Sequence, residues 1–166
     1  MIGSTGSGKT TFGRALAQRL DVPHVELDAL HWRSGWVPAC PEEVRERIGP
    51  VLAGDGWVVD GNYGGTLGTM VLDQADLIVW LDLPFSTTFW RLLRRTITRA
   101  RTHEHLWKTT NRETLRRTLF SRDSILLFLL RTYRGRRRRY SVLVASYPNV
   151  RLRTARDAER YLEEAR

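Results

Sequence analysis

The chain opens with the stretch GSTGSGKT, from Gly3 to Thr10. Its spacing follows the pattern G-x-x-x-x-G-K-[ST], which is typical of a loop that binds phosphate groups. Glycines at positions 3, 6 and 8 let the backbone turn inward, so that successive N–H groups point at a phosphate. Apolar residues at helical spacing follow and predict a helix from Lys9 to Leu20, whose positive dipole end adds to the attraction. Together these features predict a Walker A loop that binds a nucleoside triphosphate.

Each position of the loop has an expected role. We expect Lys9 to bridge the β- and γ-phosphates, the Thr10 hydroxyl to ligate Mg²⁺, and Thr11 to donate to the α-phosphate. The residues predicted to bind Mg-ATP are Gly3, Ser4, Thr5, Gly6, Ser7, Gly8, Lys9, Thr10 and Thr11. The alternative is a glycine-rich turn that matches the pattern by chance, and the amphipathic helix after the loop argues against it.

Length and composition predict one folded domain over residues 1–166, because hydrophobic residues make up 42% of the chain and charged residues 27%. The net charge of +9 comes almost wholly from arginine, since Lys9 and Lys108 are the only lysines. This charge predicts an anionic partner, either a phosphate-rich small molecule or nucleic acid. The alternative for any single exposed arginine is a solvated charge with no ligand.

Several classes of protein are disfavoured. The longest purely apolar run, Ile125–Leu130, is far shorter than the roughly 20 residues of a membrane span, and no secretory signal opens the chain. The single cysteine, Cys40, cannot form an internal disulfide. The segment His103-Glu104-His105 lacks the third ligand of a zinc site. We therefore expect a cytoplasmic protein, monomeric or homodimeric, without membrane or zinc.

Strands alternate with helices along the chain, which predicts an α/β fold with a parallel sheet and helices on both faces. Apolar runs predict strands at Val25–Asp28, Trp57–Gly61, Leu77–Leu83 and Val150–Arg153. A second helix is expected to begin near Pro41, and helices are expected to dominate from Ser86 to about Ser146. A last helix is expected after Thr154, which forms a capping-box-like pair with Asp157.

The order of these motifs resembles the adenylate-kinase-like group of P-loop kinases over nearly the whole chain. Within that group, LDALHW (Leu27–Trp32), GWVVDGNYG (Gly56–Gly64) and the late SILLF are similar to the FlaR-type topology modulation proteins. Those are described as DNA topology modulators, although their motifs are those of small-molecule kinases. The resemblance implies a three-layer fold with strand order 2-3-1-4-5. Only Met1 and Ile2 precede the loop, so we expect the central first strand to be largely missing.

The resemblance also implies roles for two aspartates. Asp60 matches a carboxylate that holds Mg²⁺ through water, and Asp28 matches one that lies near the acceptor hydroxyl. One departure concerns the acceptor: Asn62, Tyr63 and Gly64 stand where adenylate kinases have Phe-Pro-Arg, which disfavours AMP. Asn62 and Tyr63 would suit a hydroxylated or aromatic acceptor, and Tyr63 fits core packing equally well.

Arginines recur every fourth residue after the fourth predicted strand, at Arg91, Arg95 and Arg99. In a kinase these belong to an arginine-rich lid, roughly residues 95–140, that closes over the triphosphate and neutralises the transferring phosphoryl group. Arg112 and Arg116 are candidates to join them. The alternative is a solvated helix face.

Two functions follow from these observations. The first is an ATP-dependent phosphotransferase acting on a small nucleotide or hydroxyl acceptor, with Lys9, Asp28, Arg95 and Arg99 as catalytic residues and Thr10 and Asp60 at the Mg²⁺. The second is a nucleic-acid-associated ATP-binding protein, whose phosphate contacts would be Arg131, Arg134 and Arg136–Arg139. Standard DNA-binding signatures are absent, which favours the kinase and leaves only weak, non-specific nucleic-acid binding.

Overall fold

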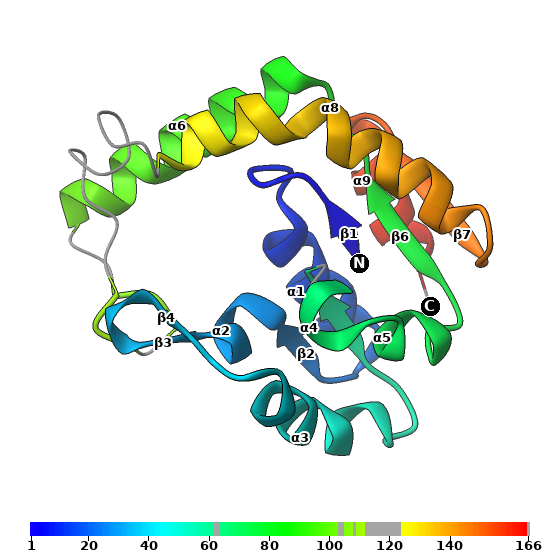
Figure 1. Cartoon of the computed structure of the whole chain (residues 1–166). Coiled ribbons are helices and arrows are strands. Elements are labelled where there is room, and N and C mark those ends of the chain that lie inside the picture. The colour runs from blue at the N-terminus through cyan, green and yellow to red at the C-terminus, as the bar shows by residue number, and fades with distance from the viewer. Residues whose placement is uncertain (62–63, 103–104, 108, 112–123, 166) are drawn as a thin grey trace.

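The computed structural model of the chain describes residues 1–61, 64–102, 105–107, 109–111 and 124–165 (Figure 1). The strands are β1 (Ile2–Gly3), β2 (His24–Glu26), β3 (Trp32–Arg33), β4 (Val37–Pro38), β5 (Val58–Asp60), β6 (Ile78–Leu81) and β7 (Asn149–Leu152). The helices are α1 (Lys9–Leu20), α2 (Leu27–His31), α3 (Pro41–Leu52), α4 (Gly64–Leu67), α5 (Met70–Asp73), α6 (Phe85–Thr102), α8 (Ile125–Val144) and α9 (Ala155–Glu164), with a short 3-10 helix η1 (Ser34–Trp36).

The sheet has the predicted parallel order. Strand β6 pairs in parallel with both β1 and β7, and β2 pairs in parallel with β5. Met1 joins the two parts, because its ammonium donates to the carbonyl of Val59 at 2.5 Å and its carbonyl accepts from the N–H of Gly61 at 3.2 Å. Met1 thus bonds to Val59 and Gly61, the two residues on either side of Asp60, and this is the hydrogen-bond pattern of a parallel ladder. The strands therefore run β2-β5-β1-β6-β7, which is the predicted order 2-3-1-4-5.

The first strand is short, as expected, yet it is in place at the centre of the sheet. Ile2 is 1% exposed and lies in a cluster of buried side chains with Trp80 of β6 and Tyr140 of α8. The backbone of Met1 supplies the contact to β5 that a longer strand would make. The phosphate-binding loop consequently leaves the sheet at its centre, between the ends of β5 and β6.

Side chains of β6 alternate between two layers of helices. Val79 and Leu81 pack with α1 and with the apolar face of α9, whereas Trp80 packs on the other side against Tyr140 of α8, with ring centroids 6.2 Å apart. The long helices α6 and α8 lie side by side (Figure 1), and Leu92 and Leu129 form a separate buried cluster between them. The result is the predicted three-layer α/β fold.

Two local predictions can be compared directly. The capping box of α9 is confirmed, since the Thr154 hydroxyl accepts from the N–H of Asp157 and the Asp157 carboxylate accepts from the N–H of Thr154. The prediction of a strand continuing to Asp28 is wrong, because β2 ends at Glu26 and α2 begins at Leu27. Glu26 is paired with Asp60, the last residue of β5, so the ladder between the two strands ends there.

The tyrosines of α8 tie part of the predicted lid range to the core. Tyr133 donates to the carbonyl of Leu83 at 2.7 Å, and Tyr140 is buried against the sheet. A lid within residues 95–140 stays a proposal. The contacts of Tyr133 and Tyr140 attach the second half of α8 to the sheet and its flanking loop. None of the described helices combines the length and apolar character that a membrane span requires.

The buried amine of Met1 gives a prediction about pH. Burial lowers its pKa from 8.0 to about 6, although the nearby Asp60 carboxylate opposes the shift. The folded state therefore holds this proton less tightly than the unfolded state. The amine's contribution to stability is present above the unfolded pKa and is lost as pH falls through the folded pKa, with a difference on the order of 2–3 kcal/mol.

Placing about six apolar, β-branched residues ahead of Met1 should raise the melting temperature and remove this pH dependence. The longer strand buries both of its faces, and the amine moves into solvent. Thermal unfolding followed by circular dichroism near pH 6 and near pH 8 measures both effects. An extended chain that melts at the same temperatures as the shorter one would contradict the prediction.

Candidate functional site

The predicted phosphate loop has the backbone geometry that its glycines suggested. Gly6 and Gly8 have φ angles of 85° and 91°, in the left-handed region that side chains rarely adopt. A Cβ atom at Gly6 would lie 2.6 Å from the carbonyl oxygen of Thr88 and 2.8 Å from the Cβ of Leu92. The loop thus requires glycine both for its turn and for its close approach to α6.

Lys9 begins α1 directly after the loop. Its ammonium donates to the carbonyl of Ser4 at 3.1 Å, so the side chain folds back over the loop. Burial lowers the pKa of Lys9, while the nearby carboxylates of Asp28 and Asp60 oppose that shift. A partly buried ammonium in the first turn of a helix is stabilised by an anionic ligand, which fits the role predicted for Lys9.

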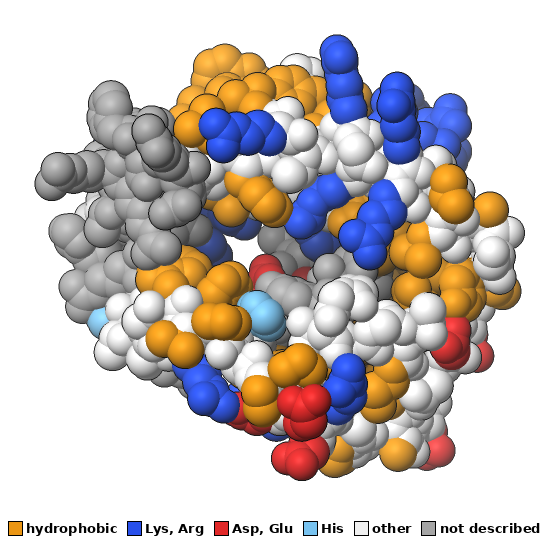
Figure 2. Space-filling view, in the orientation of Figure 1, with side chains coloured by type: hydrophobic (Ala, Val, Ile, Leu, Met, Phe, Trp, Pro, Cys, Tyr) orange, Lys and Arg blue, Asp and Glu red, His pale blue; other side chains and the backbone are white. Residues whose placement is uncertain are grey.

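One cavity of about 1260 Å³ surrounds the loop. Figure 2 shows the hollow, with basic side chains along its upper edge and acidic side chains visible inside. The loop, the ends of β2 and β5, and the helices α2, α6, α8 and α9 all contribute to its lining. The volume exceeds the roughly 300–1,000 Å³ of a typical single-ligand pocket, so two ligands fit.

Three carboxylates line the cavity beside Lys9. Asp60, at the end of β5, is 1% exposed and hydrogen-bonded to His24 Nε2 at 3.0 Å. Glu26 is its register partner at the end of β2, and Asp28 lies in the first turn of α2. The carboxyl ends of parallel strands are where such folds place their ligands.

Glu26 is the site residue that the sequence analysis missed. Its Oε1 accepts from Trp107 Nε1 at 3.0 Å and lies 3.5 Å from the hydroxyl of Thr10. Burial raises the pKa of Glu26, and the carboxylates of Asp60 and Asp28 add to the rise, while Trp107 and Arg99 oppose it. The sequence signal for Glu26 is that it ends a parallel strand, where such folds place their ligands. Because the strand was expected to continue to Asp28, Glu26 was not recognised as its last residue.

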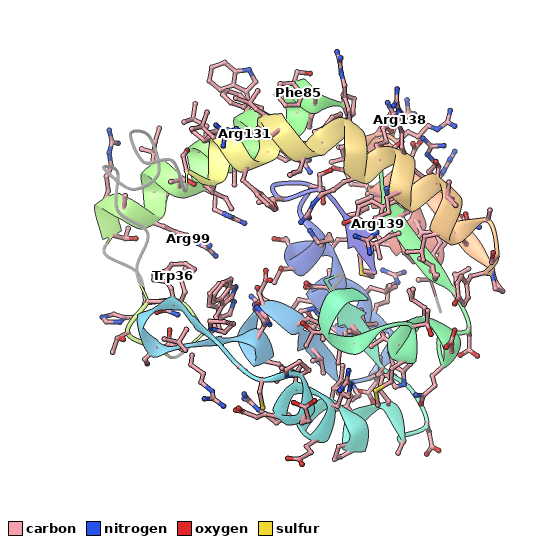
Figure 3. All side chains as sticks on the ribbon, viewed as in Figure 1. Trp36, Phe85, Arg99, Arg131, Arg138 and Arg139 are labelled. Atoms are coloured by element: carbon pink, nitrogen blue, oxygen red, sulfur yellow. The ribbon has the colours of Figure 1, made fainter. Side chains whose placement is uncertain are left out.

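The arginine ridge of α6 faces the loop. Arg91, Arg95 and Arg99 all line the cavity, and Arg91 Nη1 donates to the carbonyl of Ser7 at 3.3 Å. Figure 3 shows Arg99 directed from α6 toward the interior, on the side of Trp36. The spacing of four residues therefore gathers three guanidinium groups on one wall of the cavity.

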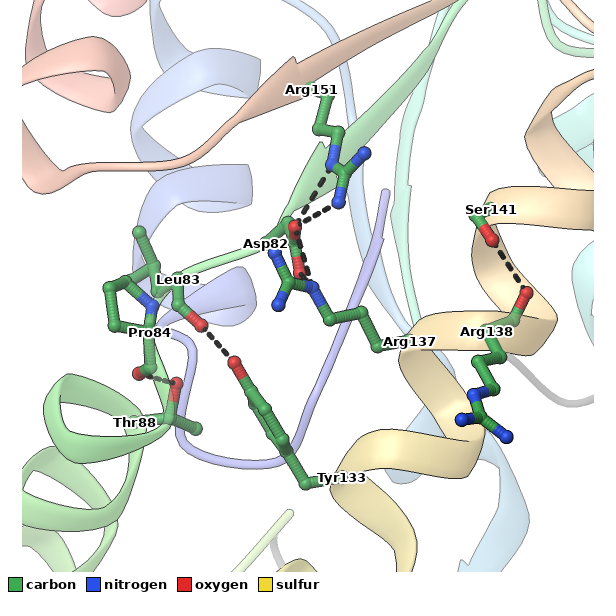
Figure 4. Close-up of polar contacts among 9 residues, drawn as sticks. All are labelled: Asp82, Leu83, Pro84, Thr88, Tyr133, Arg137, Arg138, Ser141 and Arg151. Carbon is green, nitrogen blue, oxygen red and sulfur yellow. Dashed lines mark hydrogen bonds and ion pairs between the residues drawn. The ribbon is translucent and has the colours of Figure 1, made fainter.

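The arginines of α8 divide into groups with different surroundings. Arg131 and Arg136 line the cavity. Arg137 instead pairs with the buried Asp82 at 2.9 Å, and Arg151 of β7 binds the same carboxylate at 2.5 Å (Figure 4). Arg138 points away from the cavity (Figure 3). The cluster that sequence reasoning treated as one surface is therefore not a single patch.

Some predicted residues lie outside the described part of the chain. These are Asn62, Tyr63, Arg112, Arg116 and the His103-Glu104 pair of the disfavoured zinc segment.

Among the described residues, no three His, Cys, Asp or Glu side chains cluster as ligands for a metal ion. Mg²⁺ in nucleotide sites, however, is held by one or two carboxylates, a hydroxyl and the phosphates themselves. The hydroxyl of Thr10 and the carboxylates of Glu26 and Asp60 supply donors of that kind at one place.

Comparison with known proteins agrees with this geometry. The family model described as ATPase family associated with various cellular activities (AAA) matches residues 1–54, less than half of the chain, including the phosphate loop. The structure is similar to the 1.7 Å crystal structure of shikimate kinase from Bacteroides thetaiotaomicron, with a TM-score of 0.56 and 16% identity over 98% of this chain and 92% of that one. No curated protein sequence matches the chain. The structural likeness shows a fold shared with a P-loop kinase.

Replacing Lys9 with alanine should abolish measurable Mg-ATP binding while leaving the melting temperature nearly unchanged, because the bond that its ammonium makes within the described residues is to a loop carbonyl. Isothermal titration calorimetry with Mg-ATP checks the affinity, and circular dichroism checks the fold. Arg19→Ala, on the same helix but outside the cavity lining, is the matched control and should keep wild-type affinity. Wild-type affinity in Lys9→Ala would refute the assignment of the loop.

Arg137 and Arg138 should differ in stability although they are adjacent. Arg137→Ala removes one of two partners of the buried Asp82 and should lower the free energy of unfolding by about 1 kcal/mol, since Arg137 is half exposed and Arg151 remains. Arg138→Ala should change it by less than about 0.5 kcal/mol. Urea unfolding measures both variants, and equal losses would contradict the assigned pairing.

Proposed function

We propose that the protein is a P-loop phosphotransferase that moves the γ-phosphoryl group of Mg-ATP to a hydroxyl group of a small-molecule acceptor. The observation that carries the proposal is the meeting, in one cavity, of the phosphate loop, the arginine ridge of α6, and the carboxylates Glu26, Asp28 and Asp60. Binding of phosphate alone would need only the first two. The carboxylates supply what a transfer reaction adds, namely a proton acceptor and metal ligands.

In this reaction the acceptor hydroxyl oxygen forms a bond to the γ-phosphorus while the bond from that phosphorus to the bridging oxygen of ADP breaks. The hydroxyl proton passes to Asp28, and ADP leaves with the bridging electrons. Asp28 suits the role of base because it lines the cavity close enough to Lys9 to affect its pKa. Its position in the first turn of α2 keeps the carboxylate on a rigid element.

Charge on the transferring group is neutralised by residues already in place. Lys9 begins a helix and Arg91 is hydrogen-bonded to the loop, so neither requires a large rearrangement to face a triphosphate. Arg95 and Arg99 extend the same ridge along the cavity wall. Preorganised donors of this kind stabilise the transition state more than the ground state.

The donor set for Mg²⁺ would be Thr10, Asp60 and Glu26 together with phosphate oxygens, and the ion would supply charge neutralisation at the β- and γ-phosphates. Asp60 keeps its orientation through the hydrogen bond to His24. Glu26 is poised between the Thr10 hydroxyl and Trp107. Asp60 acts on the nucleotide side and Asp28 on the acceptor, and Glu26 lies between the two, because it contacts both Thr10 and Trp107.

The motif order supports placing the chain in the adenylate-kinase-like group, near the FlaR-type proteins, as part of this proposal. The nucleic-acid alternative is less well supported by the arginines assigned to it. Arg131 and Arg136 line the nucleotide cavity, and Arg137 is engaged with Asp82. Of those six residues, Arg134, Arg138 and Arg139 are exposed and lie outside both the cavity lining and the pair with Asp82. A cytoplasmic location and a monomeric or homodimeric state stay predictions.

Asp60→Asn and Asp28→Asn should reduce turnover by different routes. The first should raise the Mg²⁺ concentration needed for half-maximal rate, because a metal ligand loses its charge. The second should lower the maximal rate at saturating Mg-ATP by about a hundredfold or more, because the base is lost. Coupled ADP release across a Mg²⁺ titration measures both, with the exposed Asp55→Asn as control. Superimposable Mg²⁺ curves for Asp60→Asn and the wild type would rule out the metal role.

A further inference from the structure

Three tryptophans form one wall of the cavity. Trp36 lies between the other two, with its ring centroid 5.8 Å from that of Trp32 at 71° and 5.8 Å from that of Trp107 at 86°. All three line the cavity that contains the phosphate loop. Edge-to-face packing of this kind fixes the rings relative to one another and leaves aromatic surface exposed to a ligand.

The wall is assembled from segments far apart in the sequence. Trp32 and Trp36 belong to the β3–β4 hairpin, whereas Trp107 precedes Asn111, whose side chain is 1% exposed. The Oδ1 of Asn111 accepts from the N–H of Trp36 at 2.8 Å, and its Nδ2 donates to the carbonyl of Arg33 at 2.9 Å. A buried amide with both groups satisfied holds the two segments together.

Backbone strain is concentrated at this wall. Trp36 and Trp107 have φ angles of 61° and 51°, and Asp21 is the other non-glycine residue with positive φ in the described part of the chain. The left-handed region costs a bulky residue on the order of 1 kcal/mol or more. Strained residues persist where the surrounding contacts hold them, and they cluster at sites that bind ligands.

Two carboxylates lie beside the wall and accept hydrogen bonds. Glu26 receives the indole N–H of Trp107, and Asp28 is two residues further along the chain at the cavity surface. Ionised carboxylates accept and cannot donate. A ligand that donates hydrogen bonds to Glu26 and Asp28 therefore fits this part of the cavity, and a negative charge placed next to the two carboxylates is unfavourable.

We propose that Trp32, Trp36 and Trp107, with Glu26 and Asp28, form the acceptor subsite, and that it takes an uncharged hydroxylated ring compound of the sugar or nucleoside class. This inference rests on the proposed phosphotransferase function and narrows its acceptor. The ring lies against the tryptophans, and its hydroxyl groups donate to the carboxylates. A phosphorylated ring is disfavoured, because its charge would lie beside two carboxylates while the arginine ridge is occupied by the triphosphate.

The dimensions of the cavity agree with two adjoining subsites. Its volume of about 1260 Å³ leaves room for an acceptor beside the nucleotide. Arg99 belongs to the boundary between them, because it influences the pKa of Glu26 and points toward Trp36 (Figure 3). The transferred phosphoryl group would thus pass beside Arg99 on its way from one subsite to the other.

The test measures transfer of the labelled γ-phosphoryl group from Mg-ATP to matched pairs of compounds, each an uncharged sugar or nucleoside and its own monophosphate. We expect transfer to at least one uncharged member and to none of the monophosphates. In Trp36→Ala the KM for that acceptor should rise about tenfold to a hundredfold, while the Kd for Mg-ATP is unchanged. The Asn111 contact is retained, because it uses the backbone N–H of Trp36.

Trp90→Ala is the matched control, since Trp90 on α6 is 61% exposed and outside the cavity lining. Its KM should equal that of the wild type. If Trp36→Ala does not fold, Trp32→Ala gives the same measurement. Transfer only to monophosphates, or a KM unaffected by loss of the ring, would overturn the acceptor subsite while leaving the phosphotransferase intact. Mg-ATP binding without transfer to any member of either set would overturn both.

Discussion

The parallel pairing of β1 with its two neighbours is the constraint on which the rest of the structure depends. The strand is only Ile2–Gly3, but the ladder to β6 and the two backbone bonds of Met1 hold it between β5 and β6. Because the phosphate loop continues directly from it, the position of this strand decides where the loop emerges. A shift of one residue would reverse the direction of Ile2 and carry the loop away from the ends of the flanking strands.

The site lies at these strand ends, where basic and acidic side chains line the same cavity. The loop, the arginine ridge of α6 and the carboxylates Glu26, Asp28 and Asp60 all line one cavity. Lys9 lines it too, and the effect of Asp28 and Asp60 on its pKa opposes that of burial. Such a distribution suits a reaction in which a polyanion and a proton donor must meet in one cavity.

Much of the fold could be predicted from local patterns. Apolar runs located β5, β6 and β7 within two residues. Pro41 marked the start of α3, and the Thr154–Asp157 pair marked the cap of α9. The spacing of Arg91, Arg95 and Arg99 also predicted correctly that they share one face of α6, which lines the cavity. These features depend on periodicity and capping, which are properties of short segments.

Other features depend on contacts between distant segments and could not be predicted. The end of β2 at Glu26 coincides with the end of its partner strand β5 at Asp60. The tryptophan wall exists because Asn111 joins two remote segments, and the sequence marks neither Asn111 nor its partners. The partnership of Arg137 with Asp82 likewise connects α8 to a loop 55 positions away in the sequence.

The attachment of α8 bears on the entropy of ligand binding. Tyr133 and Arg137, one turn apart, fasten the helix to the end of β6, and Tyr140 fastens it again against Trp80. Arg136 projects from this fixed stretch, with its guanidinium 4.8 Å above the centre of the Phe128 ring. Freezing a long side chain on binding normally costs on the order of 1 kcal/mol in rotamer freedom. A guanidinium already stacked on a ring, and carried by a helix that is already anchored, loses little further freedom when a phosphate arrives.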